Sequence, residues 1–269
     1  MNDFLLDGTF FGNPWVIPLL LFVFGCCIGS FLNVCIYRLP LDRSIVAPRS
    51  SCPKCQTPIR ALDNIPLLSY VWLRGRCRKC KASISWRYPL VEASTGALAV
   101  ALFFSFGLSV QSLMYFSLAA ALIVITFIDL DHRIIPDVIS LPGIGLGILL
   151  AALLPGMNLQ DSLIGLLLGG GSLYLVARVY EAFTRREGMG MGDVKLLAMI
   201  GAWLGWQSVL FIIFFSSLTG TMIGGLAMLF YGKGRHYAIP FGPFLALSAL
   251  AYIFVGPDLI RWYLALREI

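Results

Sequence analysis

Long apolar segments dominate this chain and limit its possible folds more than any other feature. A helix needs roughly 20 consecutive apolar residues to cross a bilayer core. Hydrophobic residues make up 58% of the 269 residues and charged residues only 13%, whereas a soluble domain carries about 25% charged residues. These features predict an all-α polytopic membrane protein with about eight transmembrane helices. The predicted spans are residues 15–37, 89–106, 111–128, 138–154, 162–183, 194–204, 207–231 and 242–264.

The sixth of these segments, residues 194–204, is short for a complete span. It can be partly re-entrant, or it can continue as a longer helix across Gly205, Trp206 and Gln207. The sequence leaves both alternatives open.

Positive charge is concentrated in one loop. Eleven of the 20 Lys and Arg residues lie between Arg38 and Arg87, a stretch whose acidic residues are Asp42 and Asp63. Basic residues beside apolar spans are typical of cytoplasmic loops, so the net charge of +6 indicates a membrane topology and not a nucleic-acid partner. We therefore expect a periplasmic N-terminus, with membrane lipid as a partner. The other basic residues assigned to the cytoplasmic side are Arg133, Arg185, Arg186, Lys233 and Arg235, whereas Arg261 and Arg267 fall on the opposite side.

Two Cys-x-x-Cys pairs lie in the basic loop, and they consist of Cys52, Cys55, Cys77 and Cys80. Four thiolates in two such pairs suit a tetrahedral structural zinc ion. Two disulfides or four free thiols are the alternatives, but disulfides do not persist in the cytoplasm. We therefore predict a small zinc-ribbon-like module. The remaining cysteines, Cys26, Cys27 and Cys35, lie in the first apolar segment and are expected to be small packing residues.

Two aspartates are the strongest candidates for catalysis. Asp129 and Asp193 fall at ends of spans that the charge pattern assigns to one membrane face, and ionisable residues at membrane depth are by default functional candidates. Two neighbouring carboxyl groups share a proton, so one can activate a water molecule while the other polarises a scissile carbonyl. Gly190 and Gly192 precede Asp193 and would let an extended substrate approach the backbone. The pattern predicts hydrolysis of a peptide bond.

Simpler structural roles compete for each of these acidic residues. Asp193 could be the N-cap of the following helix, and Asp137 is expected to be an N-cap or first-turn residue. Asp131 would point away from Asp129 on a continuing helix, where it would be solvated or paired with Arg133. Asp129 resists a capping role, because it ends a span at its C-terminus, where the helix macrodipole disfavours negative charge.

The chain resembles the type IV prepilin peptidases in a series of motifs that follow one another almost from end to end. The motifs are Gly29–Val34, the two cysteine pairs, Asn64–Tyr70, Arg87–Glu92, Asp129–Asp137, Gly188–Gly201 and Pro240–Pro243. The resemblance implies an aspartic endopeptidase of the GxGD type in the bacterial inner membrane, with Asp129 and Asp193 as catalytic residues at the cytoplasmic face.

The same resemblance implies two reactions and a division of the chain. Short basic leaders would be cleaved from prepilins and pseudopilins after a glycine. The new terminal residue would be N-methylated with S-adenosylmethionine, while the four cysteines hold zinc. The expected parts are an N-terminal segment with the first span at 1–37, a methyltransferase-associated loop at 38–88, and a protease region at 89–269.

The residues that bind S-adenosylmethionine are not evident, because the sequence contains no strand–GxGxxG–helix unit. Asn33, Asp63, Asn64 and Glu92 are polar groups near the boundary between loop and membrane. They would contact the cofactor or the new amino terminus, or else serve as caps, turn residues and interfacial hydrogen-bonding groups. His132 and His236 have no partner at ligand spacing and are expected to be interfacial polar residues.

Two other classes of protein remain as alternatives. A transporter would use the aspartates for ion coupling, which predicts carboxylates near the membrane midplane on broken helices. A non-catalytic scaffold would use the zinc loop to dock a partner, which leaves Asp129 without a role.

Overall fold

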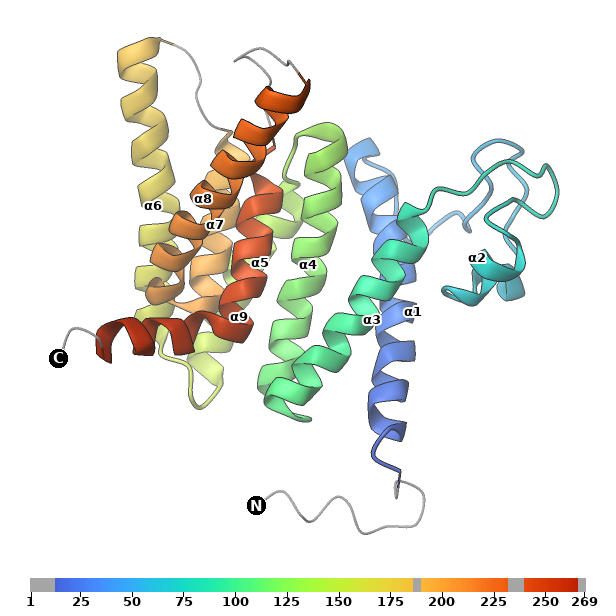
Figure 1. Cartoon of the computed structure of the whole chain (residues 1–269), viewed down its shortest axis with the longest axis horizontal. Helices are drawn as coiled ribbons and strands as arrows, with labels where there is room; N and C mark the ends of the chain where they lie inside the picture. The colour runs from blue at the N-terminus through green and yellow to red at the C-terminus, as the bar shows by residue number, and fades with distance from the viewer. Residues whose placement is uncertain (1–12, 186–189, 232–239, 266–269) are drawn as a thin grey trace. The chain divides into compact units, whose positions relative to one another are not determined.

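The computed structural model describes residues 13–185, 190–231 and 240–265. Within these ranges the regular structure is helical, with two isolated β-bridges (Figure 1). The chain divides into two compact units, Met1–Val124 and Ile125–Ile269. Among the residues discussed above, Arg186, Gly188, Met189, Lys233, Arg235, His236 and Arg267 lie outside the described ranges.

All eight predicted spans are helices, which confirms the predicted all-α class. In the part of the chain that the structure describes, six helices are long and apolar enough to cross a membrane, whereas α5 and α7 are shorter. The helices are α1 (Val16–Arg38), α3 (Arg87–Phe106), α4 (Val110–His132), α5 (Asp137–Leu153), α6 (Leu159–Thr184), α7 (Met191–Leu204), α8 (Trp206–Tyr231) and α9 (Gly242–Ala265).

The short helix α7 forms the core of the second unit. Every residue from Val194 to Trp203 except Lys195 is buried. The helix ends at Gly205, whose φ of 79° is favourable for glycine, and whose N–H donates to the carbonyl oxygen of Gly201 at 2.9 Å. Because α8 begins at the next residue, the expectation of one helix running across residues 205–207 is wrong.

Glycines allow α6 to pack closely on α7. A Cβ added at Gly169 would lie 2.5 Å from the carbonyl oxygen of Leu197, and one added at Gly165 would collide with the backbone of Gly201. Small residues permit such close approach of membrane helices. Gly165 and Gly169 therefore allow the close packing of the two helices, whereas a Cβ at Gly171 would meet nothing within 4 Å.

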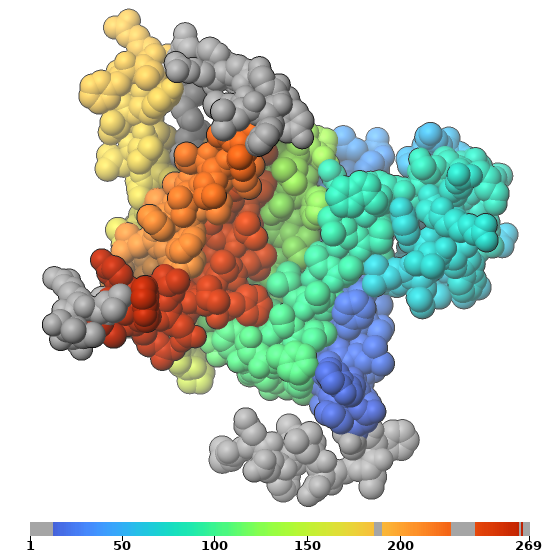
Figure 2. Space-filling model, in the orientation of Figure 1, coloured from blue at the N-terminus to red at the C-terminus, as the bar shows by residue number. Residues whose placement is uncertain are grey.

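The first unit joins two membrane helices to the cysteine loop. Helices α1 and α3 pack through small residues, because a Cβ added at Gly25 would lie 2.7 Å from Gly96 Cα. The loop between them contains the 3₁₀ helices η1 (Leu39–Leu41) and η2 (Ala61–Asn64) and the short helix α2 (Leu68–Trp72). These residues form a small lobe of the first unit, drawn in light blue to teal in Figure 2.

Candidate functional site

Asp129 lies in the last turn of α4 and is 5% exposed. The helix ends just after it, because Arg133 adopts a left-handed backbone with φ of 56° and its N–H donates to the carbonyl oxygen of Asp129 at 2.9 Å. Asp131 and His132, by contrast, are exposed. Burial therefore distinguishes Asp129 from the other acidic residue of the same turn.

The partner of the Asp129 carboxylate is the beginning of another helix. The N–H of Gly242, the first residue of α9, donates to Asp129 Oδ2 at 3.0 Å. Free N–H groups and the positive end of the macrodipole at a helix N-terminus stabilise negative charge. This contact offsets the unfavourable position of Asp129 at the C-terminal end of α4.

Asp193 is the third residue of α7 and is half-buried. Gly190 occupies the N-cap position, so the expectation that Asp193 itself is the N-cap does not hold. Its carboxylate lies in the first turn, where the helix dipole favours a negative charge. A Cβ added at Gly190 would lie 3.6 Å from Asp193 Oδ2, so the missing side chain leaves this carboxyl group open on one side.

The structure brings Asp129 and Asp193 together. A charge on Asp129 acts electrostatically on Asp193, and Ile135 connects the two sides of the site. A Cβ added at Gly242 would lie 2.6 Å from Asp129 Oδ2 and 3.4 Å from Ile135 Cδ1, and one added at Gly192 would lie 3.0 Å from Ile135 Cβ. The last turn of α4, the first turn of α7 and the start of α9 therefore converge on one site.

A salt bridge ties a fourth helix end to the same site. Lys195 Nζ donates to both carboxylate oxygens of Asp137 at 2.8 Å. Asp137 is the first residue of α5, with Pro136 as the N-cap, so its predicted first-turn position is confirmed and an N-cap role is wrong. Lys195 lies two residues after Asp193, so this pair joins the first turns of α5 and α7.

Sequence reasoning did not find Gly242, Ile135 or Lys195 as parts of this site. Gly242 was noted only within a family motif, and the hydrogen bond to Asp129 joins residues 113 positions apart. The charge pattern offered one signal for Lys195, a lone cation at the start of an apolar helix two residues after an aspartate. No local pattern indicated that its partner would be Asp137.

The four cysteines of the loop form a cluster that could hold a metal ion. Their sulfur atoms all lie within 4.8 Å of one another. Cys52 Sγ is 3.8 Å from Cys80 Sγ, and Cys55 Sγ is 3.9 Å from Cys77 Sγ. These distances exclude disulfides, whose S–S bond is about 2.05 Å. A tetrahedral ion with Zn–S bonds of about 2.3 Å separates its sulfur ligands by about 3.8 Å, so the residues fit zinc.

The two cysteine pairs share one backbone geometry. Gln56 and Lys81, each four residues after the first cysteine of its pair, adopt φ values of 54° and 59°. Their N–H groups donate to the carbonyl oxygens of Cys52 and Cys77 at 2.8 and 3.0 Å. Each pair thus forms a tight turn that directs both of its thiols to the same centre.

Hydrogen bonds prepare two of these thiols for metal binding. Hydrogen bonding to Thr57 lowers the pKa of the Cys55 thiol to about 6. The backbone N–H groups of Cys80 and Lys79 lower the pKa of the Cys77 thiol below its usual range. Because the thiolate is the form that binds metal, these contacts favour ligation by Cys55 and Cys77. The pKa of the Cys80 thiol is instead raised to about 11, because the backbone hydrogen bond of Ala82, which lowers it, is outweighed by desolvation and by hydrogen bonds to the other three cysteines.

Polar residues at the boundary between loop and membrane have structural partners. Asn33 Nδ2 donates to the carbonyl oxygen of Tyr88 at 3.1 Å, which links α1 to the start of α3. The buried Glu92 accepts a hydrogen bond from the Leu67 N–H at 2.8 Å. Both contacts agree with the alternative in which these residues make structural hydrogen bonds at the interface instead of contacting a cofactor.

Asp63 also has a structural partner within the loop. Arg78 Nε donates to Asp63 Oδ2 at 2.9 Å, and the second guanidinium nitrogen lies 2.5 Å from Oδ1. This hydrogen bonding holds the pKa of Asp63 below its usual range. The pair connects η2, which also contains Asn64, to the second cysteine turn.

Comparison with known proteins assigns the chain to a family. Residues 23–106 match the bacterial peptidase A24 N-terminal domain, and residues 116–225 match the type IV leader peptidase family. Proteins named prepilin leader peptidase/N-methyltransferase are similar along nearly the whole chain. The one from Aeromonas hydrophila is 41% identical over 94% of this chain and 96% of its own, and the one from Neisseria gonorrhoeae is 40% identical over the same shares.

A more distant relative with the same name, from Legionella pneumophila, is 35% identical over 97% of this chain and 99% of its own. No solved structure matches the chain. The six apolar helices and this similarity identify a multi-pass membrane protein. The chain belongs to the type IV leader peptidase family.

Proposed function

We propose that this chain cleaves leader peptides from type IV prepilins and pseudopilins and N-methylates the new terminal residue. The convergence of Asp129 and Asp193 carries the proposal for cleavage. The names of the relatives include both activities. Asp129 and Asp193 are the catalytic residues in this proposal.

The geometry suggests a role for each carboxyl group. The Gly242 N–H stabilises negative charge on Asp129, so we assign Asp129 as the general base that removes a proton from water. The water oxygen then attacks the scissile carbonyl carbon, while Asp193 donates its proton to the carbonyl oxygen. When the C–N bond breaks, Asp129 returns its proton to the leaving nitrogen. One hydroxyl of the intermediate restores the proton of Asp193.

The cysteine loop is assigned to the second reaction. Cys52, Cys55, Cys77 and Cys80 would hold a structural zinc ion, which contributes folding free energy to a small module. S-adenosylmethionine would supply the methyl group, and none of the described residues is assigned to its binding. We attribute methylation to the loop at 38–88 and cleavage to the region at 89–269.

The topology proposal places the N-terminus in the periplasm and the site at the cytoplasmic face of the inner membrane. If α1, α3 and α4 each cross once, the cysteine loop and Asp129 lie on the same side. The hydrogen bond from Gly242 to Asp129 and the salt bridge from Lys195 to Asp137 support this assignment. Both contacts join helix ends that the proposed topology places at one face. A basic loop at this face suits the positive-inside rule.

The transporter and scaffold alternatives are not supported. The two carboxyl groups lie in the terminal turns of α4 and α7 rather than in the middle of a span. A scaffold would not require a buried aspartate held by the start of another helix.

One assay tests the proposed function directly. Purified protein is incubated with a prepilin and S-adenosylmethionine, and the product masses are measured. Asp129→Asn and Asp193→Asn should each abolish cleavage with normal membrane insertion. Asp137→Asn serves as the control and should retain substantial activity. Cleavage by Asp129→Asn at a rate near that of the wild type would refute the catalytic assignment.

A further inference from the structure

The short helix α2 of the cysteine loop presents large apolar side chains to the exterior. Leu68, Val71 and Trp72 are exposed, and Val71 is 73% exposed. Leu62 in the adjacent η2 is also exposed. Apolar surface gathered on a small loop module indicates an interaction site. Because these residues belong to the loop and not to a predicted span, the lipid-facing surface of the spans does not account for them.

A hydrogen bond fixes the position of α2 along the apolar helix α3. The N–H of Leu67, the residue before α2, donates to Glu92 Oε2 at 2.8 Å. Glu92 is the sixth residue of the apolar span α3 and is buried against α1, where a Cβ added at Gly29 would lie 2.7 Å from Glu92 Cα. At 1.5 Å per residue, Glu92 lies roughly 8 Å along α3 from its first residue.

This tether holds the start of α2 beside the first turns of a membrane-spanning helix, as Figure 1 shows for α2 and α3. Because Glu92 lies in the second turn of α3, α2 cannot move away from this helix while the hydrogen bond is kept. The apolar side chains of α2 therefore lie at the level where the span enters the bilayer.

The charges and aromatic residues around α2 are those of a membrane interface. Arg74 and Arg76, which follow α2, are exposed, as is Arg60 before η2. Trp72 and Trp86 are also exposed, at the end of α2 and immediately before α3. Tryptophan is enriched at the level of lipid headgroups, and clustered arginine near the membrane attracts anionic lipid.

We propose that α2 and the adjacent η2 form an interfacial anchor, in which Leu62, Leu68, Val71 and Trp72 insert into the headgroup region while Arg74 and Arg76 bind anionic phospholipid. The anchor would hold the cysteine module against the bilayer surface. A prepilin is a less suitable occupant of this surface, because its basic leader would be repelled by the arginines. The inference rests on the first unit alone and does not depend on the proposed catalytic residues.

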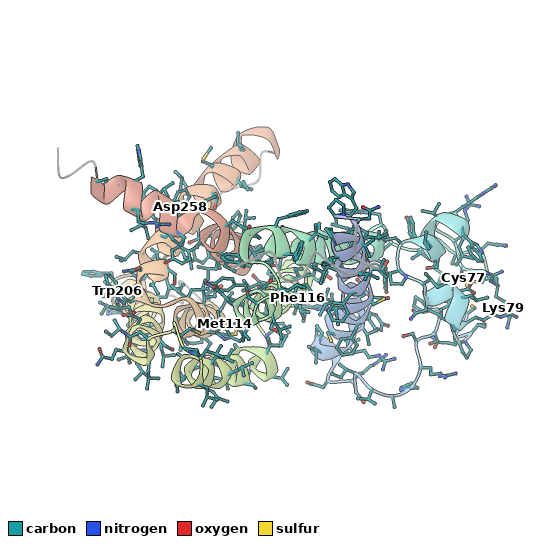
Figure 3. All side chains as sticks on the ribbon, turned by 90° about the horizontal axis from the view of Figure 1, so that it is seen from below. Cys77, Lys79, Met114, Phe116, Trp206 and Asp258 are labelled. Carbon is teal, nitrogen blue, oxygen red and sulfur yellow. The ribbon has the colours of Figure 1, made fainter. Side chains whose placement is uncertain are left out.

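Photocrosslinking of the full-length protein tests this anchor. The protein carries p-benzoylphenylalanine in place of Val71 and is reconstituted in vesicles of phosphatidylcholine and phosphatidylglycerol. After irradiation, intact mass spectrometry measures the adducts. The matched control places the same group at Lys79, which is exposed on the second cysteine turn and points away from α1 in Figure 3. A second reporter at Leu68 keeps the test decisive if the Val71 variant does not fold.

We expect phospholipid adducts at position 71, with a yield several-fold above that at position 79. Arg74→Gln combined with Arg76→Gln should lower the share of phosphatidylglycerol among those adducts several-fold. Crosslinks from position 71 to another part of the same chain would overturn the proposal, as would crosslinks that form only with added prepilin. Absence of adducts at both 71 and 68 would show a water-exposed helix and would also overturn it.

Discussion

Lys195 Nζ lies 2.8 Å from both carboxylate oxygens of Asp137, although 58 positions separate the two residues. This pair joins α7 to the start of α5 beside the candidate active site. Asp137 begins α5, shortly after the end of α4 that carries Asp129, and Lys195 follows Asp193 in α7. The salt bridge therefore holds the part of α7 that carries Asp193 against the start of α5, which follows the end of α4 that carries Asp129.

The first prediction concerns this salt bridge. The pair is partly exposed, and exposed pairs contribute about 0.2–1 kcal/mol to stability. Asp137→Asn and Lys195→Met should therefore each lower the cleavage rate only modestly. The charge-reversed double variant, Asp137→Lys with Lys195→Asp, should cleave faster than either Asp137→Lys or Lys195→Asp alone. Initial rates at saturating prepilin provide the comparison. A double variant no faster than the single reversals would show that the ion pair does not position α7.

The second prediction concerns Gly242. Its added Cβ would lie 2.6 Å from Asp129 Oδ2, closer than van der Waals contact permits, so Gly242→Ala must displace the carboxylate. A misplacement of about 1 Å can lower a catalytic rate on the order of 100-fold, and we expect a loss of this order in kcat. Gly225→Ala in α8 is the matched control, because its added Cβ would meet nothing within 4 Å. Equal rates for the two variants would contradict the proposed role of the α9 N-terminus.

The third prediction concerns the metal. Elemental analysis of the purified protein should find about one zinc per chain, the stoichiometry of a four-ligand structural site. Replacing Cys52 and Cys55 together with serine should remove that zinc. Cys27→Ser, at an exposed position in α1, should retain it. Stoichiometric zinc in the double variant would place the metal site elsewhere.

The fourth prediction separates the two activities. Loss of zinc should unfold the cysteine module locally, because metal binding supplies much of the folding free energy of such modules. Cys77→Ser should therefore lower methylation far more than cleavage. Asp193→Asn should block cleavage, and with full-length prepilin it should also block methylation, because no new amino terminus forms.

Pre-cleaved pilin provides the control for this separation. When it is supplied in detergent, methylation by Asp193→Asn should return, as measured by the mass of the product. Equal loss of both activities in a normally inserted Cys77→Ser protein would show that the module supports the protease region, and two independent sites would then be ruled out.

The fifth prediction concerns topology. A reporter fused after Pro155 should read periplasmic, and one inserted near Thr57 should read cytoplasmic, because Lys and Arg are concentrated on the cytoplasmic side. The opposite readings would place the proposed catalytic aspartates away from a cytoplasmic leader and would contradict the proposed cleavage.

The class of fold and the cluster of cysteines could be predicted from the amino-acid sequence. Apolar length is a local property, so all eight helices could be located from composition along the chain. Paired cysteines separated by two residues can occupy one centre with little further information, because each turn is local. The four sulfur atoms accordingly lie in one cluster. Asp129 could also be singled out as a functional candidate, because an ionisable group at the end of an apolar span is costly.

How the buried Asp129 carboxylate is stabilised could not be predicted, because its contacts join distant parts of the chain. Gly242 reaches Asp129 across 113 positions, and Lys195 reaches Asp137 across 58. Such contacts depend on which helix ends meet, and helix packing in a membrane is determined by close contact of small residues, such as Gly165 with Gly201, rather than by periodic hydrophobicity. The end of α7 at Gly205 also depends on helix packing. A buried helix packed on all sides need not reach the length of a lipid-spanning one, so apolar length could not predict where α7 ends.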